Sequence, residues 1–309
     1  MPSLKAIRKR ITTTKATQKI TRAMKMVAGA RLARAQARIL ALRPYALKTQ
    51  EILAALAAPT EESENGEGGL ESQPAHPYLA VRPEQNVALV FLTGDRGLCG
   101  AFNTNINKAA ERAWREHTGQ EGKTVHIFTA GRKGRDYLKR RGAPLDDDFP
   151  LAGELNLDKA RLISRTIMPR FVKGEIDSIY LVYNEFKSAM TQRVVVEKLL
   201  PLKRAGNGDA AATSGAQEQG RTQVDYIYEP NKGALLDRLV PMYIEISILR
   251  ALLESTASEL GARMTAMDSA TKNAKEMIDS LTLAYNRARQ AAITKELMEI
   301  IGGAEALKE

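Results

Sequence analysis

The stretch LLDRLVPMYIEISILRALLESTASELGARMTAMDSATKNAKEMIDSLTLAYNRARQA, residues 235–291, decides the fold of this chain. Along it a core-type position recurs every three or four residues, which is the pattern of a helix wound around another helix. Only Thr256 and Arg263 break the apolar character of the series. The positions are Leu235, Leu239, Met242, Ile246, Leu249, Leu253, Thr256, Leu260, Arg263, Met267, Ala270, Ala274, Met277, Leu281, Ala284, Ala288 and Ala291. At about 1.5 Å per residue such a helix is roughly 85 Å long, so it must project from the protein and meet a partner.

The N-terminal end of the chain carries a matching helix. Apolar residues follow the same three-four spacing from Leu4 to Leu56. Four polar residues interrupt this spacing: Thr14, Gln18, Thr21 and Lys25. Ser3 is placed to cap the helix, which we expect to run to about Ala57. Pro44 lies inside it and predicts a kink, because proline removes one backbone hydrogen bond.

Two long helices that flank one compact middle segment are predicted to pair antiparallel, like the arms of a hairpin. If Leu56 lies beside Leu235, Leu4 lies near residue 287. The C-terminal helix then extends past the N-terminus by more than one turn, and a single exposed helix tip is predicted. Pro241 predicts a bend in the first turns of this helix, and the pair Gly302–Gly303 predicts its end.

The middle of the chain has the pattern of an α/β domain. Short apolar runs at 87–92, 125–129 and 179–183 alternate with helical patterns at 106–117 and 158–172. Strands that alternate with helices predict a mainly parallel sheet covered by helices.

Two segments without a hydrophobic period separate this domain from the long helices. Residues 59–77 are acidic and rich in Gly and Pro, and residues 204–221 are a low-complexity insertion of small and polar residues. A further strand is predicted at 194–200 and another at 224–228, and Asn231 is a plausible cap for the last helix. The expected organisation is an N-terminal coiled-coil helix at 1–58, the acidic loop at 59–77, the α/β domain at 78–230, and the C-terminal coiled-coil helix and tip at 231–309.

Charge is distributed very unevenly along the chain. The net charge is +10, and residues 1–50 hold thirteen Lys and Arg and no Asp or Glu, whereas the remainder holds 33 basic and 36 acidic residues. An Arg-rich N-terminus is typical of mitochondrial transit peptides, but a transit peptide has no reason to match a helix at the far end. A basic helix can also follow nucleic acid phosphates, yet no aromatic residue is interleaved with the Lys and Arg before Tyr45. An acidic protein partner explains the uneven charge better.

The sequence contains no strong motif for catalysis, nucleotide binding or metal binding. Gly94, Gly97 and Gly100 follow a strand and precede a helix, but they match neither G-x-G-x-x-G nor the Walker pattern, so a structural turn is favoured over a nucleotide site. The run Asp146–Asp148 is interpreted as solvated loop charges. Cys99 is the only cysteine, and the three histidines do not have metal-ligand spacing with it. We expect no catalytic residue, cofactor or metal, and with no run of 18 apolar residues we expect no membrane span.

Arg263 stands at a seam position, where an unpaired buried guanidinium costs several kcal/mol. Either it reaches a carboxylate or the seam opens there towards another chain. The Ala-rich part of the seam, 270–291, buries too little surface to hold a coiled coil tightly, so we expect a partner to surround it.

Both arms, and several segments between them, closely resemble the family of γ subunits of F-type ATP synthases. The matching segments are IRKRITTTKATQKITRAMKMVAGARLARAQ (7–36), SELGARMTAMDSATKNAKEMI (258–278), LAYNRARQAAITKELMEIIGGAEAL (283–307), DRGLCGAFN (95–103), VYNEFKSAM (182–190), EKLLPL (197–202) and DYIYEP (225–230). They occur in the order that the family shows, and they cover both arms and most of the α/β domain.

The resemblance implies a rotor. In that family the coiled coil stands inside a ring of three alpha and three beta subunits, and the globular base sits on the membrane c-ring beside the epsilon subunit. Proton flow turns the shaft, whose asymmetric faces drive each catalytic site through different affinities for ADP, phosphate and ATP. The chain itself would catalyse nothing and would hold no cofactor.

The resemblance also implies contact residues. Arg289 and Gln290 match a pair that touches a loop of the beta subunit, and Thr294 and Glu296 match neighbouring contact positions. The shaft positions that match are Arg10 and Lys19, which would face acidic beta segments, and Met24, near the contact between rotor and stator; Arg263 is added from the seam argument.

Two departures from the family limit what carries over. Segments 59–77 and 204–221 match nothing in the family, so the contacts near the base are left open. The regulatory cysteine pair of the plant type is absent, and the chain starts directly at the shaft with MPSLKAIRKR. We therefore expect a bacterial form without a transit peptide, located at the cytoplasmic face of the inner membrane. The open alternatives are a basic coiled-coil nucleic-acid binder and a small nucleotide-dependent enzyme.

Overall fold

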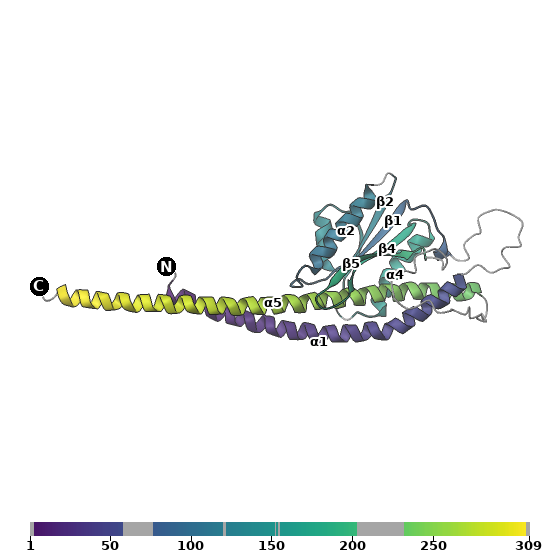
Figure 1. Cartoon of the computed structure of the whole chain (residues 1–309). Coiled ribbons are helices and arrows are strands. Elements are labelled where there is room, and N and C mark those ends of the chain that lie inside the picture. The colour runs from purple at the N-terminus through teal and green to yellow at the C-terminus, as the bar shows by residue number, and fades with distance from the viewer. Residues whose placement is uncertain are drawn as a thin grey trace, which may run out of the picture.

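The computed structural model describes residues 3–57, 77–119, 122–151, 153, 155–202 and 232–306. Figure 1 shows an α/β domain on one side of a long hairpin of two helices. The elements are α1 (Leu4–Ala57), the 3-10 turn η2 (Pro77–Leu79), β1 (Asn86–Leu92), α2 (Phe102–Thr118), β2 (Thr124–Ala130), α3 (Arg132–Arg140), β3 (Leu145–Phe149), α4 (Leu157–Val172), β4 (Ser178–Phe186), β5 (Gln192–Leu200) and α5 (Lys232–Ala306). The segment 204–221, the strand predicted at 224–228, the cap Asn231 and all of 59–77 except Pro77 lie outside the described residues.

Helices α1 and α5 run antiparallel, as predicted, and three side-chain contacts fix their register. The Tyr45 hydroxyl lies 3.3 Å from Met242 Sδ, Thr21 Oγ1 lies 2.8 Å from Thr271 Oγ1, and Thr14 Oγ1 lies 3.9 Å from Met277 Sδ. Ten residues beyond this last contact on each helix, Leu4 comes level with residue 287. The predicted register is therefore confirmed, and Figure 1 shows that the end of α5 extends well past the start of α1.

Three of the four polar interruptions of the first helix, Thr14, Thr21 and Lys25, contact α5 across the seam. Thr21 is buried against Thr271, and Lys25 Nζ lies 2.6 Å from Asp268 Oδ1. Nearer the domain the seam is apolar, with a small cluster around Leu32 and Leu260. Polar residues at core positions of a coiled coil lower its stability but specify its register. This pairing explains why the sequence pattern is interrupted without a break in the helix.

The predicted start of α1 is confirmed, and the predicted end of α5 is wrong. Ser3 Oγ accepts a hydrogen bond from the Ala6 N–H at 3.3 Å. Pro44 and Pro241 both lie inside continuous helices, and α1 curves along its length (Figure 1). The pair Gly302–Gly303 does not end α5, which continues to Ala306. A glycine inside a helix costs only about 1 kcal/mol, so it interrupts a helix only where the chain also turns away.

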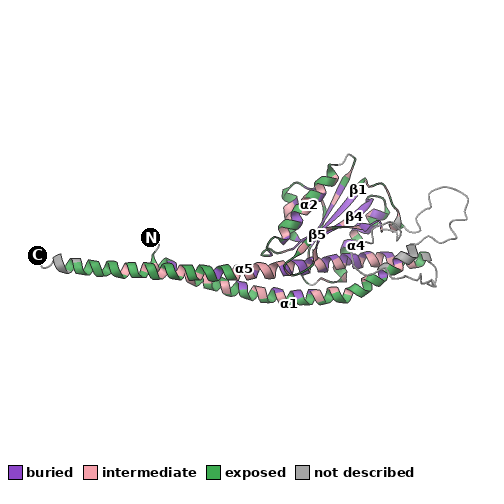
Figure 2. Ribbon diagram, viewed as in Figure 1, coloured by how far each residue is buried: buried purple, intermediate pink, exposed green. Residues whose placement is uncertain are grey.

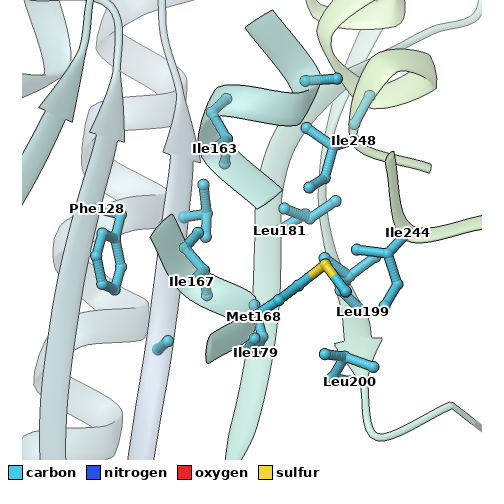
Figure 3. Packing of buried hydrophobic residues seen from close by; sticks show 14 of the residues in the cluster. Phe128, Ile163, Ile167, Met168, Ile179, Leu181, Leu199, Leu200, Ile244 and Ile248 are labelled. Atoms are coloured by element: carbon cyan, nitrogen blue, oxygen red, sulfur yellow. The ribbon is translucent and has the colours of Figure 1, made fainter. Parts of the chain in front are cut away.

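The sheet is mainly parallel, as predicted. Its strand order is β3-β2-β1-β4-β5, and only the β4–β5 pair is antiparallel. Helices α4 and α5 cover one face of the sheet, and α2 and α3 cover the other. Figure 2 shows that the strands between these layers are buried, whereas the outer side of α1 is exposed. In Figure 3, Ile167 and Met168 of α4 pack against Leu181 and Ile179 of β4, with Ile248 of α5 nearby.

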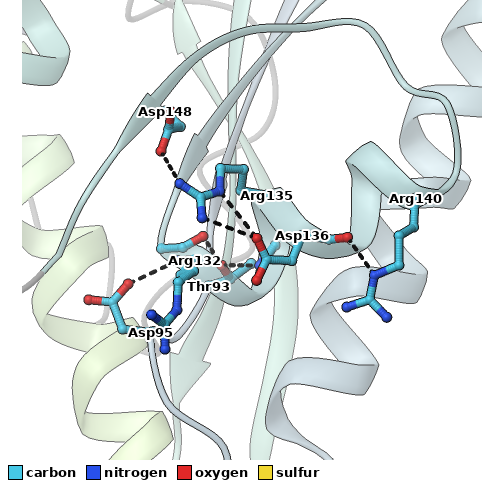
Figure 4. A network of polar contacts seen from close by, with 9 residues as sticks. Thr93, Asp95, Arg132, Arg135, Asp136, Arg140 and Asp148 are labelled. Atoms are coloured by element: carbon cyan, nitrogen blue, oxygen red, sulfur yellow. Dashed lines mark hydrogen bonds and ion pairs between the residues drawn. The ribbon is translucent and has the colours of Figure 1, made fainter.

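The run Asp146–Asp148 is exposed, as predicted, but it does not lie in a loop, because these residues form strand β3. Asp146 Oδ2 lies 2.7 Å from His126 Nδ1 and accepts a hydrogen bond from Arg170 Nη1 at 2.8 Å. Arg135 of α3 bridges Asp148 and the neighbouring Asp136 (Figure 4). Backbone pairing with β2 holds this edge strand, and basic residues from three other elements contact Asp146 and Asp148.

A charged network joins α5 to the β4–β5 ladder. Arg250 of α5 bonds to Glu197 of β5, whose second oxygen accepts a hydrogen bond from the Tyr183 hydroxyl at 2.7 Å. Arg250 Nη1 also lies 3.7 Å from Glu254 Oε1, but the other oxygen of Glu254 is buried without a partner among the described residues. Burial outweighs the attraction to Arg250 and raises the pKa of Glu254 above its ordinary value of 4.5.

Replacing Glu254 with Gln is expected to stabilise the chain at neutral pH. The unfolded carboxyl ionises near pH 4.5, whereas burial delays ionisation in the folded state, so Glu254 costs stability as the pH rises from 4.5 through its raised folded pKa. Glu254→Gln should therefore raise the free energy of unfolding by on the order of 1 kcal/mol at pH 7 and leave it unchanged near pH 4. Denaturant melts of the full chain at several pH values measure this. Glu276→Gln, on an exposed part of α5, is the matched control, and an equal gain at both pH values would contradict the argument.

The start of α3 depends on a glycine with no room for a side chain. Gly131 has φ +107°, and a Cβ atom there would lie 2.2 Å from the carbonyl oxygen of Thr93. We expect Gly131→Ala to lower the free energy of unfolding by about 2–4 kcal/mol, since it adds a backbone clash to the strain of a positive φ. Gly142→Ala, at φ +74° with open space around it, should cost only about 1–2 kcal/mol. Urea denaturation compares the two variants, and equal losses would show that the clash is relieved.

Candidate interaction surface

The glycine turn after β1 lies where open α/β sheets bind ligands, at the carboxyl ends of the strands where the strand order reverses. Here that place lies between β1 and β4, and α5 occupies it. Ser255 Oγ donates to the Leu92 carbonyl at 3.2 Å, and Ser258 Oγ donates to the Asn184 carbonyl at 2.9 Å. A Cβ atom on Gly94 would lie 3.1 Å from the Glu259 carboxylate. The turn therefore packs against the long helix α5. This packing supports the interpretation of Gly94, Gly97 and Gly100 as a structural turn.

Arg263 reaches a carboxylate, the first of its two predicted alternatives. Its guanidinium pairs with Glu259 one turn earlier on α5 and donates to the Gly97 carbonyl at 3.3 Å. The side chain is only 13% exposed. The guanidinium is therefore engaged within this chain. A contact of Arg263 with another chain stays a prediction.

Cys99 and the scattered acidic residues offer little chemistry. The Cys99 side chain is buried, and burial raises the pKa of its thiol, so the reactive thiolate is disfavoured. Within the described residues no three His, Cys, Asp or Glu side chains gather as metal ligands would. Nor does any described helix combine the length and the apolar character that crossing a bilayer requires.

The exposed side of α1 forms a basic face, in which exposed apolar side chains such as Met26 and Leu40 are interspersed. The thirteen Lys and Arg of residues 1–50 all lie on α1, and every one of them is exposed except Lys25, which is half-buried beside Asp268. Arg10 and Lys19 have no ion-pair partner in the part of the chain that the structure describes. Met24 is half-buried, next to the seam. Lys25 pairs with Asp268 and Lys48 with Glu51, but α1 carries no acidic residue before Glu51 to neutralise the rest of this face.

The tip of α5 is the second exposed surface. Arg289, Gln290, Thr294 and Glu296 are all exposed, and the Thr294 hydroxyl bonds only to the Gln290 carbonyl of its own helix, at 3.0 Å. Among the described residues, no other helix lies beside this end of α5 (Figure 2).

An apolar stripe runs along the same tip, and the sequence analysis missed it. Ile293, Leu297 and Ile301 stand four residues apart and are 53%, 55% and 52% exposed. Their spacing continues the helical period past Ala291, where the predicted seam stopped, and that spacing was the available signal. A row of large apolar side chains in water on an unpaired helix marks an interaction surface.

Comparisons with known proteins agree with this architecture. A family model described as ATP synthase matches residues 3–307. A protein named ATP synthase gamma chain from Sorangium cellulosum is 60% identical to this chain, with all of both chains covered. The chain belongs to the ATP synthase gamma-chain family. Another family member, the ATP synthase gamma chain of a Geobacter species, is 47% identical and is likewise covered in full.

Solved structures share the fold of this family member. A chain from the rotor of the Euglena gracilis mitochondrial ATP synthase has a TM-score of 0.62 and 19% identity, over 94% of this chain and 98% of that chain. A chain from the central stalk and c-ring structure of the Tetrahymena thermophila mitochondrial ATP synthase has a TM-score of 0.59 and 23% identity, over 81% and 99%. At these identities the likeness concerns the fold, including the long paired helices.

The unpaired tip should be the least stable helical part of the free chain. An isolated helix of this length is marginal in water, whereas the middle of α5 is packed on both sides. Backbone amides of residues 289–306 are therefore expected to exchange with solvent at least about 100-fold faster than those of residues 244–260, which open only with larger parts of the fold. Hydrogen exchange with mass spectrometry on the full chain measures both segments. Equal protection of the two would contradict an unsupported tip.

Proposed function

We propose that the chain is the central rotor shaft of an F-type ATP synthase, coupling rotation of a membrane c-ring to conformational cycling of three catalytic beta subunits. The observation that carries the proposal is a single helix tip, exposed and partly apolar, at the end of a paired shaft in a gamma-chain family member. Such a tip needs a surrounding partner, and a ring of three alpha and three beta subunits provides one.

The shaft is suited to this role because its faces differ. Along the paired part of the shaft, one side is the basic face of α1 and the other is α5. Beyond residue 287 only α5 remains. A shaft of this kind presents a different surface to each of three beta subunits, so each turn biases each catalytic site through different states. Work is transmitted as conformational free energy, and the chain itself catalyses no reaction.

The basic face of α1 would make weak, exchangeable contacts with acidic segments of the ring while the shaft turns. Arg10 and Lys19 are exposed side chains whose contacts would be screened by salt and individually worth less than about 1 kcal/mol. Many weak contacts allow turning better than a few strong ones. Met24, half-buried at the edge of the seam five residues beyond Lys19, would contact the stator beside this face.

The other end of the molecule would bind the remaining partners. The α/β domain lies beside the part of the hairpin opposite the tip (Figure 1). We assign to this end the epsilon subunit and the membrane c-ring, which puts the chain at the cytoplasmic face of a bacterial inner membrane as a peripheral subunit. The nucleic-acid and nucleotide-enzyme alternatives are not favoured, since family membership accounts for the basic arm and α5 fills the crevice that a nucleotide would need.

Omitting this chain from a reconstituted enzyme tests the proposal directly. Vesicles that contain the complete complex should make ATP when a proton gradient is imposed, and vesicles assembled without this chain should not. Hydrolysis by the alpha and beta subunits should also become uncoupled from proton pumping. Proton-driven ATP synthesis at the normal rate without the chain would refute the assignment.

Arg289 tests the tip within the complete enzyme. Arg289→Ala or Gln290→Ala should lower proton-driven ATP synthesis by about tenfold, the loss expected when one charge-assisted or buried polar contact is removed. The α/β domain should remain folded, because the tip lies far along α5 from it. Arg287→Ala removes the same charge two residues away, on another face of the helix, and serves as the control. Equal effects of Arg287→Ala and Arg289→Ala would show that charge alone, and not a specific contact, is involved.

A further inference from the structure

The outer helices of the α/β domain form a pocket that the rotor role does not use. It lies between α2 and α3 and has a volume of about 300 Å³. Four of its lining side chains are basic: Lys108 of α2, Lys133 and Arg140 of α3, and Arg141 at the end of α3. No carboxylate lines it.

Three of these four cations have no acidic partner within the described residues. Lys108 and Lys133 are exposed and form no ion pair. Arg140 donates its Nε–H to the backbone carbonyl of Asp136 at 3.0 Å (Figure 4) and forms no ion pair with the described residues. Only Arg141 is balanced, because its Nη1 lies 3.6 Å from Glu111 Oε1.

A polar side chain inside the pocket is also without a partner. Asn107 is only 7% exposed, lines the pocket, and its buried Oδ1 accepts no hydrogen bond from the described residues. Buried amide oxygens are nearly always paired, so the unpaired oxygen is an unsatisfied polar group in the wall of the pocket. The basic side chains and Asn107 come from two different helices and meet at one hollow.

The chemistry of the lining selects the ligand. Uncompensated cations around a concave site concentrate positive potential there and attract anions. Arg and Lys together are the side chains that proteins use for phosphate, through charge-assisted hydrogen bonds. A volume of about 300 Å³ is at the low end of the range for small-molecule sites, which favours a ligand of a few heavy atoms beyond one phosphate. We propose that the α2–α3 pocket binds a small phosphoanion of about diphosphate size.

Titration of the full-length chain with inorganic diphosphate tests the proposal. Isothermal titration calorimetry at low ionic strength should detect binding that weakens as salt is added. Lys133→Gln and Lys108→Gln, one on each helix, should each lower the affinity by about tenfold, because each removes one charge-assisted contact. Lys139→Gln is the matched control: it removes the same charge from an exposed position of α3 that does not line the pocket. Thermal melts verify that each variant is folded.

The outcomes separate the proposal from its alternatives. Loss of affinity in both lining variants with affinity retained in Lys139→Gln supports a built site. No binding of diphosphate to the unmodified chain, or equal weakening by all three substitutions, overturns it. A second arm identifies the source of the phosphate group. Sedimentation with phosphatidylcholine vesicles that contain phosphatidic acid, lost in the same two variants, assigns it to a lipid headgroup, and no sedimentation assigns it to a soluble phosphate compound.

Discussion

The structure depends on one helix that is packed on two sides at once. Between residues 240 and 260, one face of α5 buries Ile246, Leu253 and Leu260 along the seam with α1. The opposite face buries Ile244 and Ile248 in the core beneath the sheet. Because the same turns of helix complete both the coiled coil and the α/β core, the shaft cannot rotate or slide relative to the domain without breaking that core. A torque applied to the domain is therefore carried into the shaft.

Much of this arrangement could be predicted from the sequence. The three-four spacing gave both long helices, and matching their ends gave a register that the contacts of Thr14 and Thr21 confirm. The apolar runs gave the central strands, because buried parallel strands are almost continuously hydrophobic. The second apolar face of α5 was present as Val240, Ile244 and Ile248 but was not separated from the seam, since both faces follow the same helical period.

The elements that were missed are those whose stability comes from distant residues. Helix α3 has nine residues, of which only Gly134 and Leu138 are buried, and three of the five residues of strand β3 are aspartates. Strand β3 is held by pairing with β2 and by the contacts of Asp146 with His126 and Arg170, 20 and 24 residues away in sequence. Helix α3 is joined to this strand by the bond between Arg135 and Asp148. Local pattern carries no information on such contacts. Similarly, the polar seam residues Thr21 and Lys25 looked like interruptions because their partners lie about 250 residues further on.

The unpaired tip of α5 has a consequence for the life of the chain in the cell. Until a partner covers the tip, each newly made copy carries Ile293, Leu297 and Ile301 in water on a helix that no neighbour in the described chain supports. When a weakly supported helix of this kind opens, its apolar residues become targets for chaperones and proteases. Surplus copies would be removed and assembled copies spared, which would keep the number of shafts matched to the number of rings without a separate regulator.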